Sequence, residues 1–304
     1  MYIPLERVKQ LLAEAPKLGH RSQRRTVDQL TGKLRREIRC GIDKHMQAWM
    51  VLVDEAVQFF IHFEKYQYSR QLSEETVPFV MQISRTRSTL LSIRELIALG
   101  QESPAQALGR IFVEDLEMSM ALAEDSAFAK SYADAVDTLK FWQVNIGYGK
   151  INARVERFIR LGGGSADECE DRLKYHRSVK SYFSKHIHGD HSVALRVAFA
   201  PALSQPGQFY TPTLGALSTN LPHLCMFIAD EVHMFSACCI NLFTKPSPPA
   251  ALANYEHNDT LNDFIASAHV LQKLMLEYSE DLYCAQDRIT RNELDDEIFD
   301  PEQT

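Results

Sequence analysis

The stretch Leu108–Ala135 reads LGRIFVEDLEMSMALAEDSAFAKSYADA, and the spacing of its apolar residues decides the fold class. At 100° per residue, the apolar side chains fall on two arcs of a helix, and a narrow polar strip carries Arg110, Glu114 and Glu117 between them. A helix with two apolar sides is wrapped by neighbours. The stretch therefore predicts the central helix of an all-α multi-helix bundle and the start of the next helix. The polar strip is either a solvated seam or the floor of a site.

The composition agrees with a helical protein. The chain has 304 residues, of which 45% are hydrophobic and 24% charged, and its 13 Gly and 12 Pro are too few for a loop-rich all-β chain. Its six cysteines show no C-x-x-C spacing, which argues against a zinc knuckle or a disulfide framework. We therefore expect reduced, mostly buried thiols.

The charges are unevenly distributed. The net charge of -7 argues against a surface that binds nucleic acid uniformly. Residues 17–45, however, hold nine Lys or Arg against three acids, and residues 293–302 are strongly acidic. A basic N-terminal segment and an acidic tail are expected.

A cytoplasmic location without a membrane span is predicted. The N-terminus shows no basic segment followed by an apolar one, as a signal peptide would. The most apolar stretch, 46–63, carries Asp54 and Glu55 at its centre, each of which a bilayer core would penalise by roughly 2.5 to 3.5 kcal/mol. This stretch is interpreted as a core helix.

Further helices are expected along the whole chain, from periodicity and from start and stop signals. Their expected ranges are 27–38 (ended by Gly41), 46–68, 76–99, 128–146, 150–161, 165–188 (opened by a Ser165–Glu168 capping box), 221–243 and 260–285. Strands are not expected. The predicted organisation is a bundle core (1–199), an irregular linker or lid (200–220), a C-terminal helical hairpin that packs on the core or dimerises (221–289) and an acidic tail (290–304).

The last of these helices carries an apolar seam. Its apolar residues recur at alternating spacings of three and four, a pattern typical of a long antiparallel packing surface or a coiled coil. The seam consists of Leu261, Phe264, Ala268, Leu271, Met275, Tyr278, Leu282 and Ala285. A homodimer through 260–285 is predicted, since an exposed apolar stripe of this length would otherwise face water.

Two groups of residues could carry chemistry. Arg110 and Glu114 lie one turn apart, either as a partly buried ion pair or as an Arg held in place to bind a phosphate or carboxylate. On the capped helix, the residues Arg177, Ser181, Ser184 and His188 are separated by four, seven and eleven positions, which return to one face. Such a ridge could bind a phosphodiester and move protons at neutral pH, although basic residues are also favoured at a helix C-terminus without any function.

Other polar residues give weaker signals. No complete ligand set can be assigned around His186, His188, Asp190 and His191, so no metal and no cofactor are predicted. Farther on, the residues His223, Asp230, Glu231 and His233 are interpreted as the polar edge of a helix.

The two helices resemble those of a bacterial all-helical family of unknown function, whose members carry Arg-x-x-x-Glu and Ser-x-x-x-His-Gly. Here the motifs are Arg110–Glu114 and Ser184–Gly189, and the likeness runs from about Leu108 to about Asp190. That family is suspected of kinship with the HEPN group, in which an Arg and a His four to six residues apart form a metal-independent ribonuclease site. The resemblance implies an HEPN-like core with additional N- and C-terminal helices and a role in stress or phage defence. Arg39 and His45 come near to that spacing but lie outside the resembling region.

The leading functional hypothesis is an RNA- or nucleotide-directed protein, with a metal-independent ribonuclease as its catalytic form. Arg110 would hold phosphate, Glu114 would orient that Arg, and His188 would serve as acid and base. Binding would involve Arg177, Ser181 and Ser184. The alternative is a non-catalytic helical interaction protein that dimerises through 260–285.

Overall fold

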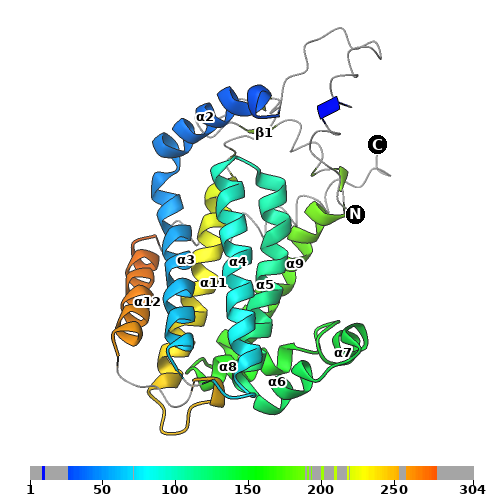
Figure 1. The fold of residues 1–304 in the computed structure, drawn as a ribbon, viewed down its shortest axis with the longest axis vertical. Helices are drawn as coiled ribbons and strands as arrows, with labels where there is room; N and C mark the ends of the chain where they lie inside the picture. Colours follow the sequence, from blue (N-terminus) through cyan, green and yellow to red (C-terminus); the bar gives the residue numbers. More distant parts are fainter. Residues whose placement is uncertain are drawn as a thin grey trace.

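The computed structural model describes residues 9–10, 27–70, 72–188, 190–191, 193, 200–201, 209–210, 218, 220–252 and 258–278. Over these residues the chain is an all-α bundle (Figure 1), which confirms the predicted fold class. The one strand pairing within them joins β1 (Ala200–Pro201) to β2 (Phe209–Tyr210) in antiparallel register, where no strand was expected. Most of 200–220 and the whole acidic tail lie outside the described residues.

The bundle is built mainly from long helices that stand side by side, with the shorter α8 at its foot (Figure 1). Its elements are α3 (Gln47–Tyr68), α4 (Val77–Ala98), α5 (Glu102–Glu124), α8 (Asn152–Leu161), α9 (Ala166–Ile187), α11 (Asn220–Phe243) and α12 (Asp259–Glu277), with a 3-10 turn at Ala250–Leu252. The helix α5 packs against α4, α8, α9 and α11, so the prediction that it is the central, wrapped helix is confirmed. Aromatic rings fill the core on the other side of the bundle, where the centroids of Phe63 and Phe264 are 4.6 Å apart.

The two most apolar helices, α3 and α11, are parts of the core. The stretch 46–63 is mostly α3 and is buried in the core, as its two acidic residues led us to expect. Among the described residues, α11 is the one helix long and apolar enough to cross a bilayer, yet 72% of its apolar window is buried inside the bundle. Burial of this kind is typical of the core helix of a globular protein.

A short helical arm projects from the foot of the bundle (Figure 1). The single helix expected over 128–146 is wrong, because the chain forms α6 (Ser126–Ala133) and α7 (Thr138–Asn145) instead. Asp125 accepts a hydrogen bond from the Phe128 amide at 3.0 Å, and Asp137 accepts one from the Lys140 amide at 2.9 Å. An Asp N-cap starts a new helix, and the second cap divides the segment. We use "arm" for α6, α7 and the turn at residues 147–149.

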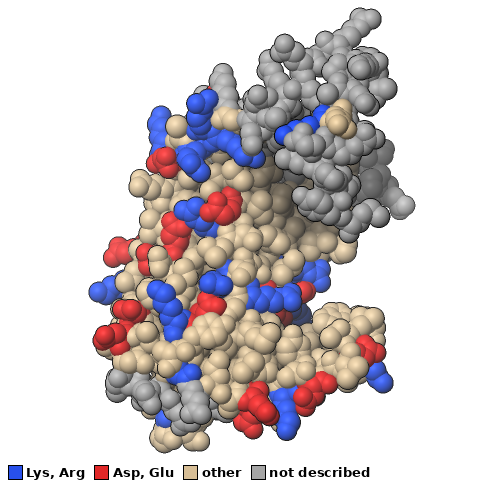
Figure 2. Space-filling model, viewed as in Figure 1, with Lys and Arg blue, Asp and Glu red and all other residues tan. Residues whose placement is uncertain are grey.

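Other helix ends agree in part with the sequence. The capping box is confirmed, with Ser165 Oγ accepting from the Glu168 amide at 3.2 Å and Glu168 accepting from the Ser165 amide at 2.7 Å. The end expected at Gly41 is wrong, because α2 (Val27–His45) continues through it and buries Ile42. Basic side chains gather over α2 in Figure 2, as the charge distribution predicted.

The apolar seam of the last helix packs inside the chain. The seam residues from Leu261 to Met275 are buried and α12 packs on α3, so the premise of an exposed stripe is wrong for this part. Tyr278 extends the same contact by donating to the Ala48 carbonyl at 3.0 Å. The remaining seam positions, Leu282 and Ala285, lie outside the described residues. Dimerisation through 260–285 stays a prediction that the buried seam does not support.

Candidate functional site

A polar cleft of about 580 Å³ lies between α5, α9 and the arm. Among its lining residues are Arg110, Glu114 and Glu117 from α5, Arg177, Lys180, Ser181 and Ser184 from α9, and Trp142 and Tyr148 from the arm. The two ridges that the sequence suggested separately therefore face one another. Arg110 Nη1 joins them directly by donating a hydrogen bond to Ser184 Oγ.

A glycine allows this close approach of α5 to α9. A Cβ atom added at Gly109 would lie 2.9 Å from the ring of Phe183, which is closer than carbon atoms tolerate. The neighbouring residues, Arg110 and Ser184, are brought into contact as a result.

The Arg110–Glu114 pair is half exposed. Arg110 Nε donates to Glu114 Oε1 at 3.0 Å, and the two side chains keep 32% and 45% of their surface accessible. A pair this exposed contributes roughly 0.2 to 1 kcal/mol. The structure therefore shows the intrahelical ion pair that the sequence allowed, partly buried at Arg110 and exposed at Glu114.

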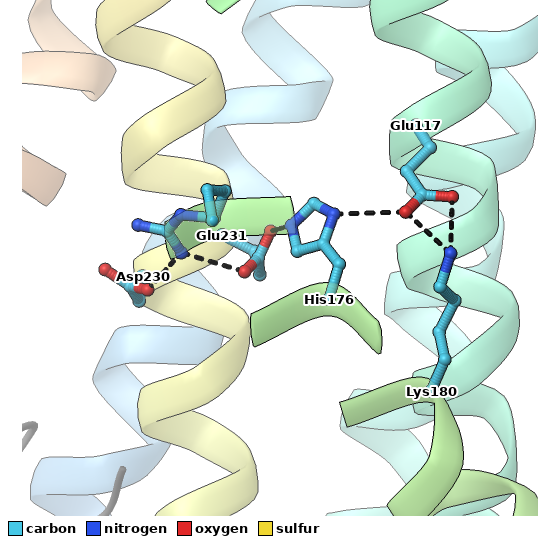
Figure 3. A network of polar contacts seen from close by, with 6 residues as sticks. Glu117, His176, Lys180, Asp230 and Glu231 are labelled. Atoms are coloured by element: carbon cyan, nitrogen blue, oxygen red, sulfur yellow. Dashed lines mark hydrogen bonds and ion pairs between the residues drawn. The ribbon is translucent and has the colours of Figure 1, made fainter. Parts of the chain in front are cut away.

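Behind the cleft lies a buried network of charged side chains (Figure 3), and His176 is at its centre. Its Nδ1 lies 3.1 Å from Glu117 Oε1, and its Nε2 lies 2.8 Å from Glu231 Oε2. All three side chains are almost completely buried.

The geometry fixes the protonation state of His176. Both ring nitrogens face carboxylates, which only accept hydrogen bonds when ionised, so both nitrogens must donate and the ring is an imidazolium. Burial alone would lower the pKa of His176, but the carboxylates of Glu231 and Glu117 more than compensate and raise it to about 9. In return, His176 and Arg172 hold the pKa of Glu231 at about 2 despite its burial. The pKa of Glu117 is likewise lowered by His176 and Lys180, against the effect of its burial.

Further ion pairs extend the network at both ends. Lys180 Nζ donates to both oxygens of Glu117 at 2.8 and 2.9 Å, which fixes its ammonium group in the cleft. At the other end, Arg172 Nη1 donates to Asp230 Oδ2 at 2.6 Å and to Glu231 Oε1 at 2.9 Å. Three acids thus balance three bases, so the buried charges compensate one another, as buried charges must.

Sequence reasoning missed this network, although a signal for it was present. The residues Arg172, His176, Lys180 and Ser184 recur every four positions, which places them on one stripe of α9. The interpretation of Asp230 and Glu231 as a polar edge is wrong, because both side chains are buried. Acids inside the otherwise apolar α11 were the sign that a basic partner packs on them.

The structure places the other predicted site residues as follows. Arg177 and Ser181 line the cleft and are exposed, and Arg177 Nε donates to the Leu173 carbonyl at 3.3 Å. His188 is the exposed C-terminal cap residue of α9 and does not line the cleft. Its catalytic role stays a prediction.

No group of three or more His, Cys, Asp or Glu side chains suited to a metal ion occurs within the described part of the chain. The comparisons with known proteins add no relative: no family model, no curated protein and no solved structure matches this chain.

Proposed function

We propose that the cleft binds the phosphate of a ribonucleotide, either as a free nucleotide or as part of an RNA strand. The observation that carries this proposal is the convergence of Arg110, Arg177 and Lys180 on one cleft that also holds two serine hydroxyls. Guanidinium and ammonium groups with nearby hydroxyls are the usual partners of phosphate oxygens.

The fixed positions of Arg110 and Lys180 support binding. Arg110 is held by Glu114 and by Ser184, and Lys180 is held by Glu117. Groups that are already ordered lose less side-chain entropy when a ligand arrives. Trp142 and Tyr148 lie at the same cleft, and their rings, whose centroids are 5.8 Å apart, can stack on a base or ribose.

Binding is favoured over cleavage by the position of the histidines. Arg172 and His176 match the HEPN spacing of four residues, but His176 is only 1% exposed and both of its nitrogens contact carboxylates. A general acid or base must reach the substrate directly or through a single water. A ribonuclease activity would therefore depend on His188, which lies one turn beyond Ser184. His188 would act on an RNA strand that runs from the cleft toward the C-terminal end of α9.

The second candidate is the non-catalytic helical interaction protein. The observation that favours it is the internal neutrality of the buried network, since three acids and three bases satisfy one another without a ligand. In that case the cleft would have no ligand and would result only from the way the helices of the bundle pack.

The test measures binding of a nucleoside monophosphate and of a short single-stranded RNA, each at two salt concentrations. Arg177→Gln removes an exposed cation of the cleft, and Lys174→Gln is a matched control because Lys174 is exposed on the same helix and pairs with Glu170. Loss of one charged hydrogen-bond partner costs about 1.5 to 3 kcal/mol, or roughly 10- to 150-fold in affinity. The control should retain wild-type affinity.

The two ligands separate the two sources of phosphate. If RNA alone binds, with a strong salt dependence, the natural ligand is a strand. If the mononucleotide binds equally well, one nucleotide suffices. Failure of both to bind, or equal losses for Arg177→Gln and Lys174→Gln, would reject the proposal and leave the interaction protein.

A further inference from the structure

A second pocket, of about 300 Å³, adjoins the cleft beneath the arm, and we call it the arm pocket. The two cavities share Glu114, Trp142 and Ile146. The two pockets are therefore neighbours at these residues, and a single ligand that occupied both would pass Trp142.

The walls of the arm pocket suit a flat, aromatic ligand. They include Met118 from α5 and the rings of Tyr132, Phe141 and Trp142 from the arm. Phe141 packs on two other rings, with its centroid 5.6 Å from that of Phe128 and 5.7 Å from that of Tyr132. Gly147 leaves room for Trp142, since a Cβ there would lie 2.6 Å from the indole. Stacking on such rings binds any nucleobase and gives little selectivity.

The polar edge of the pocket supplies selectivity. Arg85 Nε donates to Asp115 Oδ1 at 2.8 Å, and Asp115 is itself buried and bound by Gln82 at 3.1 Å and by Thr89 at 2.9 Å. The guanidinium is thus anchored through Nε, and its two terminal nitrogens keep N–H donors for an acceptor in the pocket. Glu114 uses Oε1 to hold Arg110, so its second oxygen remains a further acceptor.

We infer that the arm pocket is a guanine subsite. An Arg fork matches the O6 and N7 acceptors of guanine, and a carboxylate matches its N1–H and N2–H donors. Adenine presents an amino group where guanine has O6, and that group would meet the donors of Arg85. This inference rests on the proposed function, because the phosphate of the same nucleotide would occupy the cleft.

The test uses the indole of Trp142 as a reporter. The chain has two Trp, and Trp49 lies on α3 against Tyr278, so Trp49→Phe leaves Trp142 as the single tryptophan, which is excited selectively over the tyrosines. This full-length variant is titrated with guanosine monophosphate, adenosine monophosphate and ribose 5-phosphate. We expect the guanine nucleotide to quench Trp142 and to bind at least tenfold more tightly than the adenine nucleotide. Ribose 5-phosphate should bind more weakly than both and, because it lacks a base and should not quench Trp142, its affinity is measured by competition against the guanine nucleotide.

Variants assign the selectivity to the pocket. Arg85→Gln in the same background should abolish the preference for guanine over adenine and leave the ribose 5-phosphate affinity unchanged. Thr138→Phe, at an exposed position that lines the pocket, should weaken both nucleotides but not ribose 5-phosphate. Arg177→Gln should weaken all three ligands by a similar factor.

The outcomes distinguish the inference from the function on which it rests. Equal affinity for the two nucleotides, or a preference for adenine, would overturn the guanine subsite and leave phosphate binding in place. If none of the three ligands nor a short RNA binds, both proposals fail. The comparison of the two nucleotides in the Trp49→Phe protein decides the matter even where Arg85→Gln does not fold.

Discussion

Replacing His176 by Gln tests the buried network directly. Gln is similar in size but carries no charge, so Glu117 and Glu231 would remain buried without a cation between them. Breaking a buried ion pair by removing one partner costs about 3 to 5 kcal/mol. We expect His176→Gln to lower the free energy of unfolding by this amount near pH 6.

The pKa of His176 gives the pH dependence of this effect. It is about 9 in the folded protein against an ordinary value of 6.5, which corresponds to about 3 kcal/mol of stability. Because the folded-state pKa is raised, this stability is fully present below pH 6.5 and is lost as the pH rises through 9. Glu231 behaves oppositely: its pKa is lowered from 4.5 to about 2, so its contribution is present above pH 4.5 and is lost as the pH falls through 2. The network therefore stabilises the folded state most between the ordinary pKa values of Glu and His, 4.5 and 6.5, that is near pH 5 to 6.

The assay is urea unfolding followed by circular dichroism, for wild type and variant, at pH 6 and pH 10. The variant keeps every other titrating group but loses the cation that lowers the pKa of Glu117 and Glu231, so the difference between the two proteins reports His176 together with its two carboxylates. That difference should shrink by about 3 kcal/mol between the two pH values. His188→Gln is the matched control on the same helix, and because His188 is exposed it should cost less than about 0.5 kcal/mol. An unchanged difference between pH 6 and pH 10 would refute the assignment of His176 as a buried imidazolium.

Two further predictions concern packing. Gly109→Val should destabilise the chain by about 1 to 3 kcal/mol in thermal or urea unfolding, because the valine side chain would meet Phe183. The control Gly32→Ala has open space around it and should stabilise α2 by up to about 1 kcal/mol. Equal effects of the two variants would contradict the close approach of α5 and α9. In α12, Leu271→Asp should cost more than about 3 kcal/mol because Leu271 is fully buried, while Leu276→Asp, at a position 70% exposed, should leave unfolding unchanged. If a dimer does form through α12, light scattering should show that Leu276→Asp dissociates it. A dimer that persists in both Leu271→Asp and Leu276→Asp would have its interface elsewhere.

The fold could be predicted where the sequence pattern is local. The helix α5 was recognisable from its two apolar arcs, and the start of α9 from the capping box at Ser165. The break between α6 and α7 was missed because the N-cap at Asp137 lies within an otherwise helical pattern. The packing partner of the α12 seam could not be derived from the sequence. The same spacing of apolar residues fits a helix of the same chain and a helix of a second copy equally well.

Residues of the candidate site could be predicted where their spacing along one helix pointed to them. They could not be predicted where their role depends on contacts with other helices. Arg110 and Ser184 were singled out from spacing, and the structure brings them into contact. The role of His176 depends on Glu117 and Glu231, which come from helices far apart in the sequence. No local pattern states that three such helices meet, so the buried network required the tertiary structure.

The construction of the arm has a consequence for the kinetics of the cleft. The helix α7 contributes no buried side chain, while Phe141 and the rings beside it supply the aromatic contacts of the arm. Segments with so few buried contacts open at a small fraction of the global unfolding free energy. Amide hydrogens of residues 138–145 should therefore exchange with solvent long before those of α11. A ligand that touches Trp142 would slow the exchange of the α7 amides selectively. The rates of ligand binding and release would then follow the rate at which α7 opens, and not any motion of the bundle.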